Sequence, residues 1–497
     1  MRSMRRGTRL ATTVLVMVVC TAVLLLTFGV PTTTARETSG LATTAAAAHI
    51  IVVRPSGHDD TANLQGAFNS CASNAWTCTI QLVRGTYYTY QVTAVGFTGT
   101  IIGAGEGSTI IQAEPNLPSP NPLYNSTTSS FWNGPPGPSN PWPALFTFVG
   151  GSFEVSGVTF SEPYFHPSLG YYYQGVAYDA LVGVVIVTST ESGASSNVHF
   201  DHVAVFGAPG DSAGFNLLNG IDFEGLTLVP GGTTVADLEP LSGSLSVTNS
   251  AFVSLDSGPW FANVLNGDIT VCFDSAVNSA DPFGFFDTYG SVVTFCGNRA
   301  SDVEFGSALF IVEGLEIFSQ VATTVSISGN YFQVSDGSTG VLILDFTDSL
   351  SATVSGNVIL TDTSCGCYSS SEAVAYGYSA ISLVGLASVS ASGNVILGGG
   401  AAGVYLSGGA GAVSRNLILG TVVGVWVDYA SNIEVVGNLV LNSAEWGISV
   451  TDGSSYIAVA HNTVMGSGSF DLYWDGTGTG NVWVGNMCKT SNPPGLC

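Results

Sequence analysis

The chain has 497 residues and a formal net charge of −25, with 9% charged and 45% hydrophobic residues. That hydrophobic content excludes a disordered acidic chain, and the scarcity of ionic groups excludes the carboxylate-covered surface of a halophilic protein. Nucleic acid is excluded as a partner because 10 Lys and Arg residues cannot supply the basic clusters that bind phosphates. A single core seldom fills a chain of this length, which favours several domains or one elongated repeat architecture.

The N-terminus has the pattern of an export signal. Four arginines (Arg2, Arg5, Arg6 and Arg9) precede an uncharged stretch, 10–30, that is close to the length needed to span a bilayer. We therefore expect a signal peptide or N-terminal anchor in residues 1–35, a Thr/Ala-rich linker in 36–49, and one exported domain in 50–497. Localisation is expected to be extracellular, secreted or cell-surface anchored, with membrane contact only through an uncleaved N-terminal segment. The exported part has so few ionic groups that it suits an acidic medium, in which carboxylates are protonated.

The first exported segment predicts a short helix over 62–72, with Asp60 as its N-cap. Short strand-like runs follow at 80–87, 101–105 and 109–111. Three later stretches break the pattern of short strands and are expected to be projecting loops, near 115–143, 161–179 and 361–379. The first of these holds nine of the 20 prolines.

An internal repeat dominates the C-terminal half. Its motif is an apolar residue, two variable positions, Asn, one variable position and an apolar residue, and its asparagines are Asn330, Asn357, Asn394, Asn416, Asn438, Asn462 and Asn486. Each unit is too small to bury its own apolar face, whereas stacked units can do so with a rise of ~4.8 Å per coil. A recurring Asn can form a ladder of side-chain amides between coils. The repeat predicts an all-β, single-stranded right-handed parallel β-helix; ordinary hairpins with Asn-Gly turns are the alternative.

Eight cysteines remain after the export segment, as an oxidising compartment would lead one to expect. Their spacing predicts four local disulfides: Cys71–Cys78, Cys272–Cys296, Cys365–Cys367 and Cys488–Cys497. The 24-residue spacing of the second pair equals one coil of the later repeat, which places its Cα atoms within disulfide range.

Two ends of the exported domain resemble a known family. The N-terminal end is similar to the opening of right-handed parallel β-helix proteins of the pectin/pectate lyase-like superfamily. The similarity lies in Gly57-His-Asp-Asp-Thr61 with the helix after it, followed by Ile101-Ile-Gly-Ala-Gly105. The cysteine-bearing ending, 485–497, resembles the closing segments of secreted members. The resemblance implies a β-helix closed at one end by a capping helix. It implies little about activity, because this superfamily holds lyases, hydrolases, epimerases, tailspikes and adhesins.

Three acids are the candidate catalytic residues. Asp222 and Glu224 are two apart on an expected strand and so share a face, and Asp201 precedes them by about one coil. Two carboxyl groups are what glycoside hydrolysis requires. The alternative is that the three are isolated acids on solvated strands or turns.

Tyr171, Tyr172 and Tyr173 are the candidate substrate-binding residues, since their rings could stack on sugars; alternatively they pack their loop onto the coils. Asn197-Val-His-Phe-Asp-His202 is similar to the V-W-I-D-H signature of pectate lyases but lacks its Trp. No Arg or Lys occurs between Arg84 and Arg299, which disfavours lyase chemistry on a uronate. We predict no metal site and no cofactor; calcium could bridge an acidic polymer, but no specific motif supports it.

The sequence therefore predicts a secreted or cell-surface β-helix protein whose partner is a polysaccharide or cell-surface glycan. Three functions remain open: a glycoside hydrolase, a carbohydrate-binding protein without catalysis, and a structural or adhesive surface protein.

Overall fold

The computed structural model describes residues 49–72, 78–114, 144–163, 172–173, 176–177, 183–189, 195–207, 219–227, 238–303, 307–313, 321–335, 338–361, 378–398 and 400–497. The predicted N-terminal segments up to residue 48, the loop 115–143, most of the loops 161–179 and 361–379, and the pair Cys365–Cys367 lie outside these residues. No helix among the described residues is long and apolar enough to cross a bilayer.

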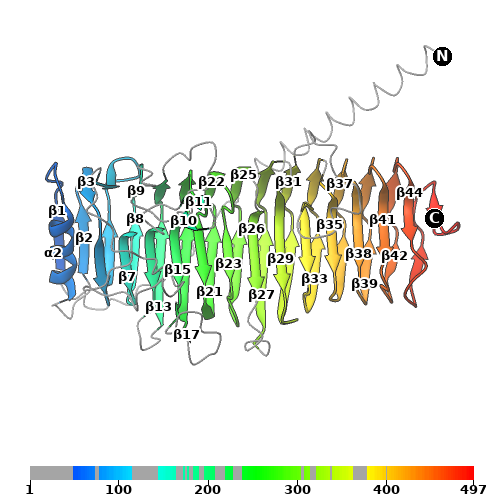
Figure 1. The fold of residues 1–497 in the computed structure, drawn as a ribbon, viewed down its shortest axis with the longest axis horizontal. Helices are drawn as coiled ribbons and strands as arrows, with labels where there is room; N and C mark the ends of the chain where they lie inside the picture. The colour runs from blue at the N-terminus through cyan, green and yellow to red at the C-terminus, as the bar shows by residue number, and fades with distance from the viewer. Residues whose placement is uncertain are drawn as a thin grey trace, which may run out of the picture. The chain divides into compact units, whose positions relative to one another are not determined.

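Three sheets, in which every strand pairing is parallel, make up the fold, and each successive strand of a sheet comes from the next coil (Figure 1). The 15-stranded sheet contains β1 (His49–Val53), β2 (Cys78–Leu82), β5 (Thr98–Ile102), β8 (Ser152–Ser156), β13 (Ser196–Asp201), β18 (Leu241–Thr248), β21 (Val264–Cys272), β24 (Val292–Cys296), β27 (Thr323–Ser328), β30 (Leu350–Ser355), β33 (Ser388–Ser392), β36 (Gly411–Ser414), β39 (Ile433–Val436), β42 (Ala458–Ala460) and β45 (Val482–Val484).

The 14-stranded sheet contains β4 (Val92–Val95), β7 (Ala144–Val149), β12 (Gly183–Thr188), β15 (Asn219–Glu224), β20 (Pro259–Ala262), β23 (Gly284–Phe286), β26 (Ser307–Glu313), β29 (Thr339–Asp345), β32 (Ile381–Val384), β35 (Ala402–Ser407), β38 (Val423–Asp428), β41 (Trp446–Thr451), β44 (Phe470–Trp474) and β46 (Ser491–Asn492).

The 13-stranded sheet contains β3 (Gly85–Thr89), β6 (Thr109–Ala113), β9 (Thr159–Ser161), β14 (Ala204–Phe206), β19 (Ala251–Val253), β22 (Ser275–Ser279), β25 (Arg299–Val303), β28 (Tyr331–Val334), β31 (Val358–Thr361), β34 (Val395–Leu397), β37 (Leu417–Leu419), β40 (Leu439–Leu441) and β43 (Thr463–Met465). Two antiparallel strand pairs lie outside the three sheets. They are β10 (Tyr172–Tyr173) with β11 (Val176–Ala177), and β16 (Leu226–Thr227) with β17 (Leu238–Glu239). The prediction of a parallel β-helix is confirmed.

The asparagine ladder is present in the predicted column. Each side-chain carbonyl accepts the backbone N–H and the side-chain amide of the preceding Asn: for Asn416 and Asn438 the two distances are 3.0 and 3.0 Å. The remaining amide proton of Asn416 goes to the backbone carbonyl of Ala391, at 2.9 Å. The side-chain amides from Asn330 to Asn462 are buried, and the chain of hydrogen bonds between them fixes one coil over the next. This combination of acceptor and donor bonds explains why Asn recurs at this position from Asn330 to Asn486.

The ladder extends further toward the N-terminus than the asparagine motif indicated. Asn298 donates its backbone N–H to Asn330 (2.8 Å), and Asp274 donates its own to Asn298 (2.9 Å). Ser250 in turn donates its N–H to Asp274 Oδ1, at 2.7 Å. Asp274 is 1% exposed and its Oδ2 has no hydrogen-bond partner. Burial, followed by the field of Asp201, raises the pKa of Asp274 well above its ordinary value.

Replacing Asp274 by Asn is expected to stabilise the protein at neutral pH by ~1–3 kcal/mol, because an amide gives the unpartnered position a donor. In the next coil, the backbone carbonyl of Val271 accepts the side-chain amide of Asn298. Val247 is the register partner of Val271, so its carbonyl is placed to accept a side-chain amide at position 274 in the same way. The measurement is urea unfolding at about pH 7 and about pH 4, and the gain should shrink at the lower pH, where Asp274 is protonated. Asp268→Asn, an exposed carboxyl on β21, is the matched control. Equal stability of Asp274→Asn and the wild type at neutral pH would contradict this account.

The N-terminal end of the core is closed by the predicted helix, α2 (Thr61–Ala72), which follows Asp60. The carbonyl of Asp60 accepts the N–H of Leu64 at 2.9 Å, and its carboxylate accepts the N–H of Ser56 at 2.9 Å. Phe68 turns into the core against Phe97, with ring centroids 5.1 Å apart. The predicted disulfide Cys71–Cys78 joins the helix to β2.

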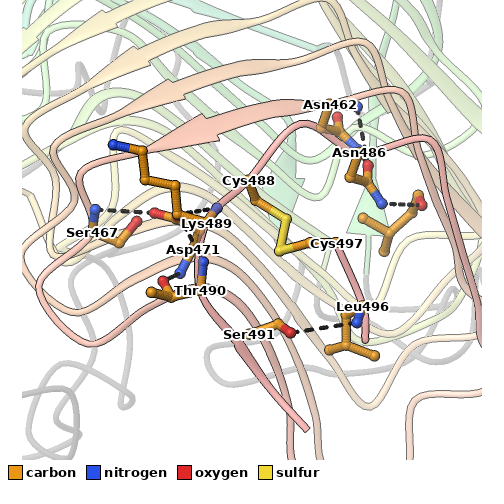
Figure 2. Close-up of a disulfide and its surroundings, with 11 residues drawn as sticks. Asn462, Ser467, Asp471, Asn486, Cys488, Lys489, Thr490, Ser491, Leu496 and Cys497 are labelled. Atoms are coloured by element: carbon orange, nitrogen blue, oxygen red, sulfur yellow. Dashed lines mark hydrogen bonds between the residues drawn. A yellow bond between two sulfur atoms is a disulfide. The ribbon is translucent and has the colours of Figure 1, made fainter. Parts of the chain in front are cut away.

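The C-terminal end is closed by the tail that follows the last Asn of the ladder. Figure 2 shows the predicted disulfide Cys488–Cys497 beside Leu496, which is buried against the core. The carboxylate of Asp471 accepts backbone N–H groups from Lys489 at 2.9 Å and Ser467 at 3.2 Å, which holds the tail on the last coil. The third confirmed disulfide, Cys272–Cys296, joins neighbouring strands of the 15-stranded sheet with a Cα–Cα distance of 4.6 Å.

Candidate active site on the 14-stranded sheet

Strand β15 of the 14-stranded sheet holds two of the three acids predicted as catalytic. Ile221 and Phe223 are fully buried in the core, and Phe223 stacks on Phe261 with a centroid distance of 4.4 Å and an interplanar angle of 6°. Because neighbours alternate in direction along a strand, Asp222 and Glu224 both turn to the outer side of the sheet. The structure therefore brings these two acids to one face.

The pair is buried more deeply than an exposed cluster would be. Asp222 is only 4% exposed. Its Oδ2 accepts the side-chain amide of Asn219 at 3.2 Å, while its Oδ1 has no hydrogen-bond partner. Glu224 is partly buried and accepts the amide of Asn263 at 2.9 Å. A buried carboxyl oxygen without a donor is costly for a purely structural residue.

Burial raises the pKa of Asp222 to about 7, and the amide of Asn219 opposes this shift only in part. Burial also raises the pKa of Glu224 well above its usual range, and the neighbouring Asp222 raises it further. Since like charges resist sharing a small apolar space, the two protons leave in separate steps. The negative charge of Asp222 favours the protonated form of Glu224.

A third carboxyl lies near the pair and was missed by sequence analysis. Asp287, directly after β23, is 4% exposed and contributes to the raised pKa of Glu224. It receives a hydrogen bond from the hydroxyl of Tyr289 at 2.8 Å and has a φ of +54°. The register, which places Asp287 one coil beyond Asn263, depends on the lengths of the intervening turns, and no motif reveals it.

Asp201 does not join this cluster. It ends β13, in the 15-stranded sheet, where Thr248 is its register partner. Partial burial alone would raise its pKa, but hydrogen bonds from Asn249, His202 and Thr248 outweigh this and hold the pKa below its ordinary value. Asp201 thus stays ionised and ties two coils together, with Asn249 and Thr248 each at 2.8 Å.

The predicted sugar-binding tyrosines are only partly described. Tyr172 and Tyr173 form β10, paired with β11, while Tyr171 and the side chains of the other two lie outside the described residues. Their role in substrate binding stays a prediction. Across the described ranges no three or more His, Cys, Asp or Glu side chains are grouped so as to hold a metal ion.

These features define the class of protein: a disulfide-bonded parallel β-helix, whose bridges indicate a compartment outside the cytoplasm. Residues 311–492 match the family model described as "Periplasmic copper-binding protein (NosD)". The match covers 182 of the 497 residues, and it does not establish the family of the whole chain. A search of curated proteins finds no match.

Several solved structures resemble the chain at low identity. The mannuronan C-5 epimerase A-module of Azotobacter vinelandii is 13% identical with a TM-score of 0.36, covering 87% of this chain and 92% of its own. The catalytic unit of a thermostable GH87 α-1,3-glucanase from Streptomyces thermodiastaticus is 12% identical, with a TM-score of 0.42 and coverages of 87% and 67%. PfbA, a surface adhesin of Streptococcus pneumoniae, is 14% identical, with a TM-score of 0.42 and coverages of 82% and 91%. At these identities and TM-scores the resemblances do not bear on activity.

Proposed function

We propose that the protein is a secreted or surface-tethered glycoside hydrolase that cleaves an extracellular polysaccharide with Asp222 and Glu224. The observation that carries the proposal is the pair itself. Two carboxyls face outward from one strand, Asp222 buried and Glu224 partly buried, both have raised pKa values, and one oxygen of Asp222 has no hydrogen-bond partner. Perturbed carboxyls that differ in proton affinity are the usual acid and base of glycoside hydrolysis.

We assign the roles from the effect of Asp222 on Glu224, because the charge of Asp222 raises the pKa of Glu224. Glu224 keeps its proton and gives it to the glycosidic oxygen as the bond from the anomeric carbon to that oxygen breaks. Asp222, as the base, takes a proton from the attacking water, and the water oxygen bonds to the anomeric carbon. One water is consumed, and each product gains a hydroxyl group.

The proposed mechanism, in which Asp222 activates a water, inverts the configuration at the anomeric carbon. The Cα atoms of residues two apart on a strand are separated by roughly 6.6 Å, twice the rise per residue, and the conformations of the two side chains set the distance between their carboxyl groups. Inverting enzymes space their carboxyls by about 6.5–9.5 Å to admit a water, whereas retaining enzymes need about 5–5.5 Å. A uronate lyase is disfavoured because the sequence has no Arg or Lys between Arg84 and Arg299.

The test is incubation of the exported domain with laminarin, dextran, xylan, polygalacturonate and alginate, at about pH 4 and about pH 7, with and without calcium. We expect reducing ends to appear from at least one polymer, with NMR showing the inverted anomer first. Unsaturated uronates would instead identify a lyase. Binding without products would move the protein to the non-catalytic or adhesive class.

A further inference from the structure

Trp260 stands beside the acid pair on the outer face of the same sheet. It is the register partner of Asp222 on the next strand, β20. Its neighbour Phe261 is fully buried in the core, so Trp260 turns outward, and its side chain is partly exposed. An aromatic ring is thus placed one coil from the buried carboxyl whose Oδ1 has no donor.

The next strand leaves room for that ring. A Cβ atom at Gly284 would lie 2.0 Å from Trp260 Cε3 and 2.1 Å from Cζ3, so the indole lies across the backbone of β23. Phe310, the register partner of Gly284 on β26, stacks beside the indole with centroids 6.4 Å apart and planes at 22°. The two rings, which we call the platform, lie nearly parallel to each other over successive coils that lead away from Asp222.

The charges around the platform select against anionic sugars. Asp222, Glu224 and Asp287 gather near its end, and no Lys or Arg occurs in the 214 residues between Arg84 and Arg299. A uronate would meet like charge once Asp222 is ionised, and Arg299, the cation that follows this stretch, lies on β25 of the 13-stranded sheet, over the ring of Tyr331. A neutral sugar ring loses nothing to this field and can place its apolar face on an indole.

We propose that Trp260, with Phe310, is the sugar-stacking platform of the site, and that the glycan it selects is neutral and lies across the strands from the acid pair toward Phe310. This proposal rests on the proposed function in that it places the bond to be cleaved at Asp222 and Glu224. Stacking on Trp260, however, requires no catalysis and can be measured separately.

The experiment measures binding by affinity electrophoresis, with Glu224→Gln as an inactive background. The gels contain either a neutral glycan (laminarin, dextran or xylan) or an acidic one (polygalacturonate or alginate). Trp260→Ala should weaken binding of the neutral glycan about tenfold or more, and Trp260→Phe should restore most of it. Gly284→Ala keeps the indole but displaces it, and should weaken binding as well. Trp446→Ala is the matched control, since Trp446 lies on β41 and stacks on Tyr473 at 4.4 Å. Thermal unfolding checks that each variant folds.

The outcomes separate the two proposals. Neutral-glycan binding that depends on Trp260, with no hydrolysis by the wild type, would support the platform and overturn the hydrolase. Hydrolysis that requires Glu224, with unchanged binding and turnover in Trp260→Ala, would overturn the platform alone. The platform is also overturned by stronger binding of the acidic glycans, by loss of binding in Trp446→Ala but not in Trp260→Ala, or by no binding to any glycan.

Discussion

Glu224→Gln is expected to lower kcat on the cleaved polysaccharide by about 10²–10⁴-fold, because Gln cannot protonate the departing oxygen. Asp222→Asn should cause a loss of similar size by removing the base that accepts the proton from water. KM should change little in both variants, because each side chain remains the same size. The measurement is the initial rate of reducing-end release under saturating and limiting substrate.

Two matched controls separate catalysis from a general effect of lost charge. Glu434→Gln changes an exposed carboxyl on β39, and Asp268→Asn changes an exposed one on β21, both in the 15-stranded sheet. Neither should alter kcat. Activity in Glu224→Gln within twofold of the wild type would contradict the assignment of Glu224 as the acid.

The pH profile of the wild type tests the order of ionisation. Because the pKa of Asp222 is raised to about 7, kcat/KM should rise with pH up to that region as the base forms. It should fall again at higher pH as Glu224 loses its proton, since the pKa of Glu224 is raised well above its ordinary value. In Asp222→Asn the rising limb should disappear from the residual rate.

The stack of coils could be predicted because residues buried at the same place in each coil recur in the sequence with the period of the coil. Asparagines that must bond each other in a column recur at every coil, and Cys272 and Cys296 repeat that spacing. Ser250 and Asp274 fill the same column without being Asn, so the motif failed there. Their place followed only from the register of the strands.

The site was predictable only within one strand. Alternation along β15 puts Asp222 and Glu224 on one face wherever the strand lies. The spacing of 21 residues between Asp201 and Asp222 suggested that they lie one coil apart. In the structure β13, β14 and β15 are the three sides of one coil, so the two acids lie in the same coil but in different sheets. The coil is longer here: the register partner of Asp201 is Thr248, 47 residues on. Trp260 and Asp287 depend on that longer register and could not be found by spacing.

Unfolding in urea is expected to show a protein that is more stable at about pH 4.5 than at about pH 8, by several kcal/mol. Burial raises the pKa values of Asp222 and Asp256 to about 7, and that of Asp428 to about 6. In the unfolded chain these groups titrate near ~3.9. Between the two sets of values the folded state binds more protons than the unfolded state, so the free energy of unfolding falls as pH rises through the folded pKa values.

The sign of the pH dependence follows from the acids with raised pKa values, which outnumber those with lowered ones. Asp274 and Glu224 act in the same direction, whereas Asp201, with its lowered pKa, gains stability above the unfolded value and opposes them. Each proton released contributes up to ~1.4 kcal/mol per pH unit, so one opposing group does not reverse the sum. The double variant Asp256→Asn/Asp274→Asn should flatten the dependence, and Asp268→Asn should leave it unchanged. Greater stability at about pH 8 would mean that these carboxyls are ionised and solvated in the folded protein, which would also remove the basis for a protonated Glu224.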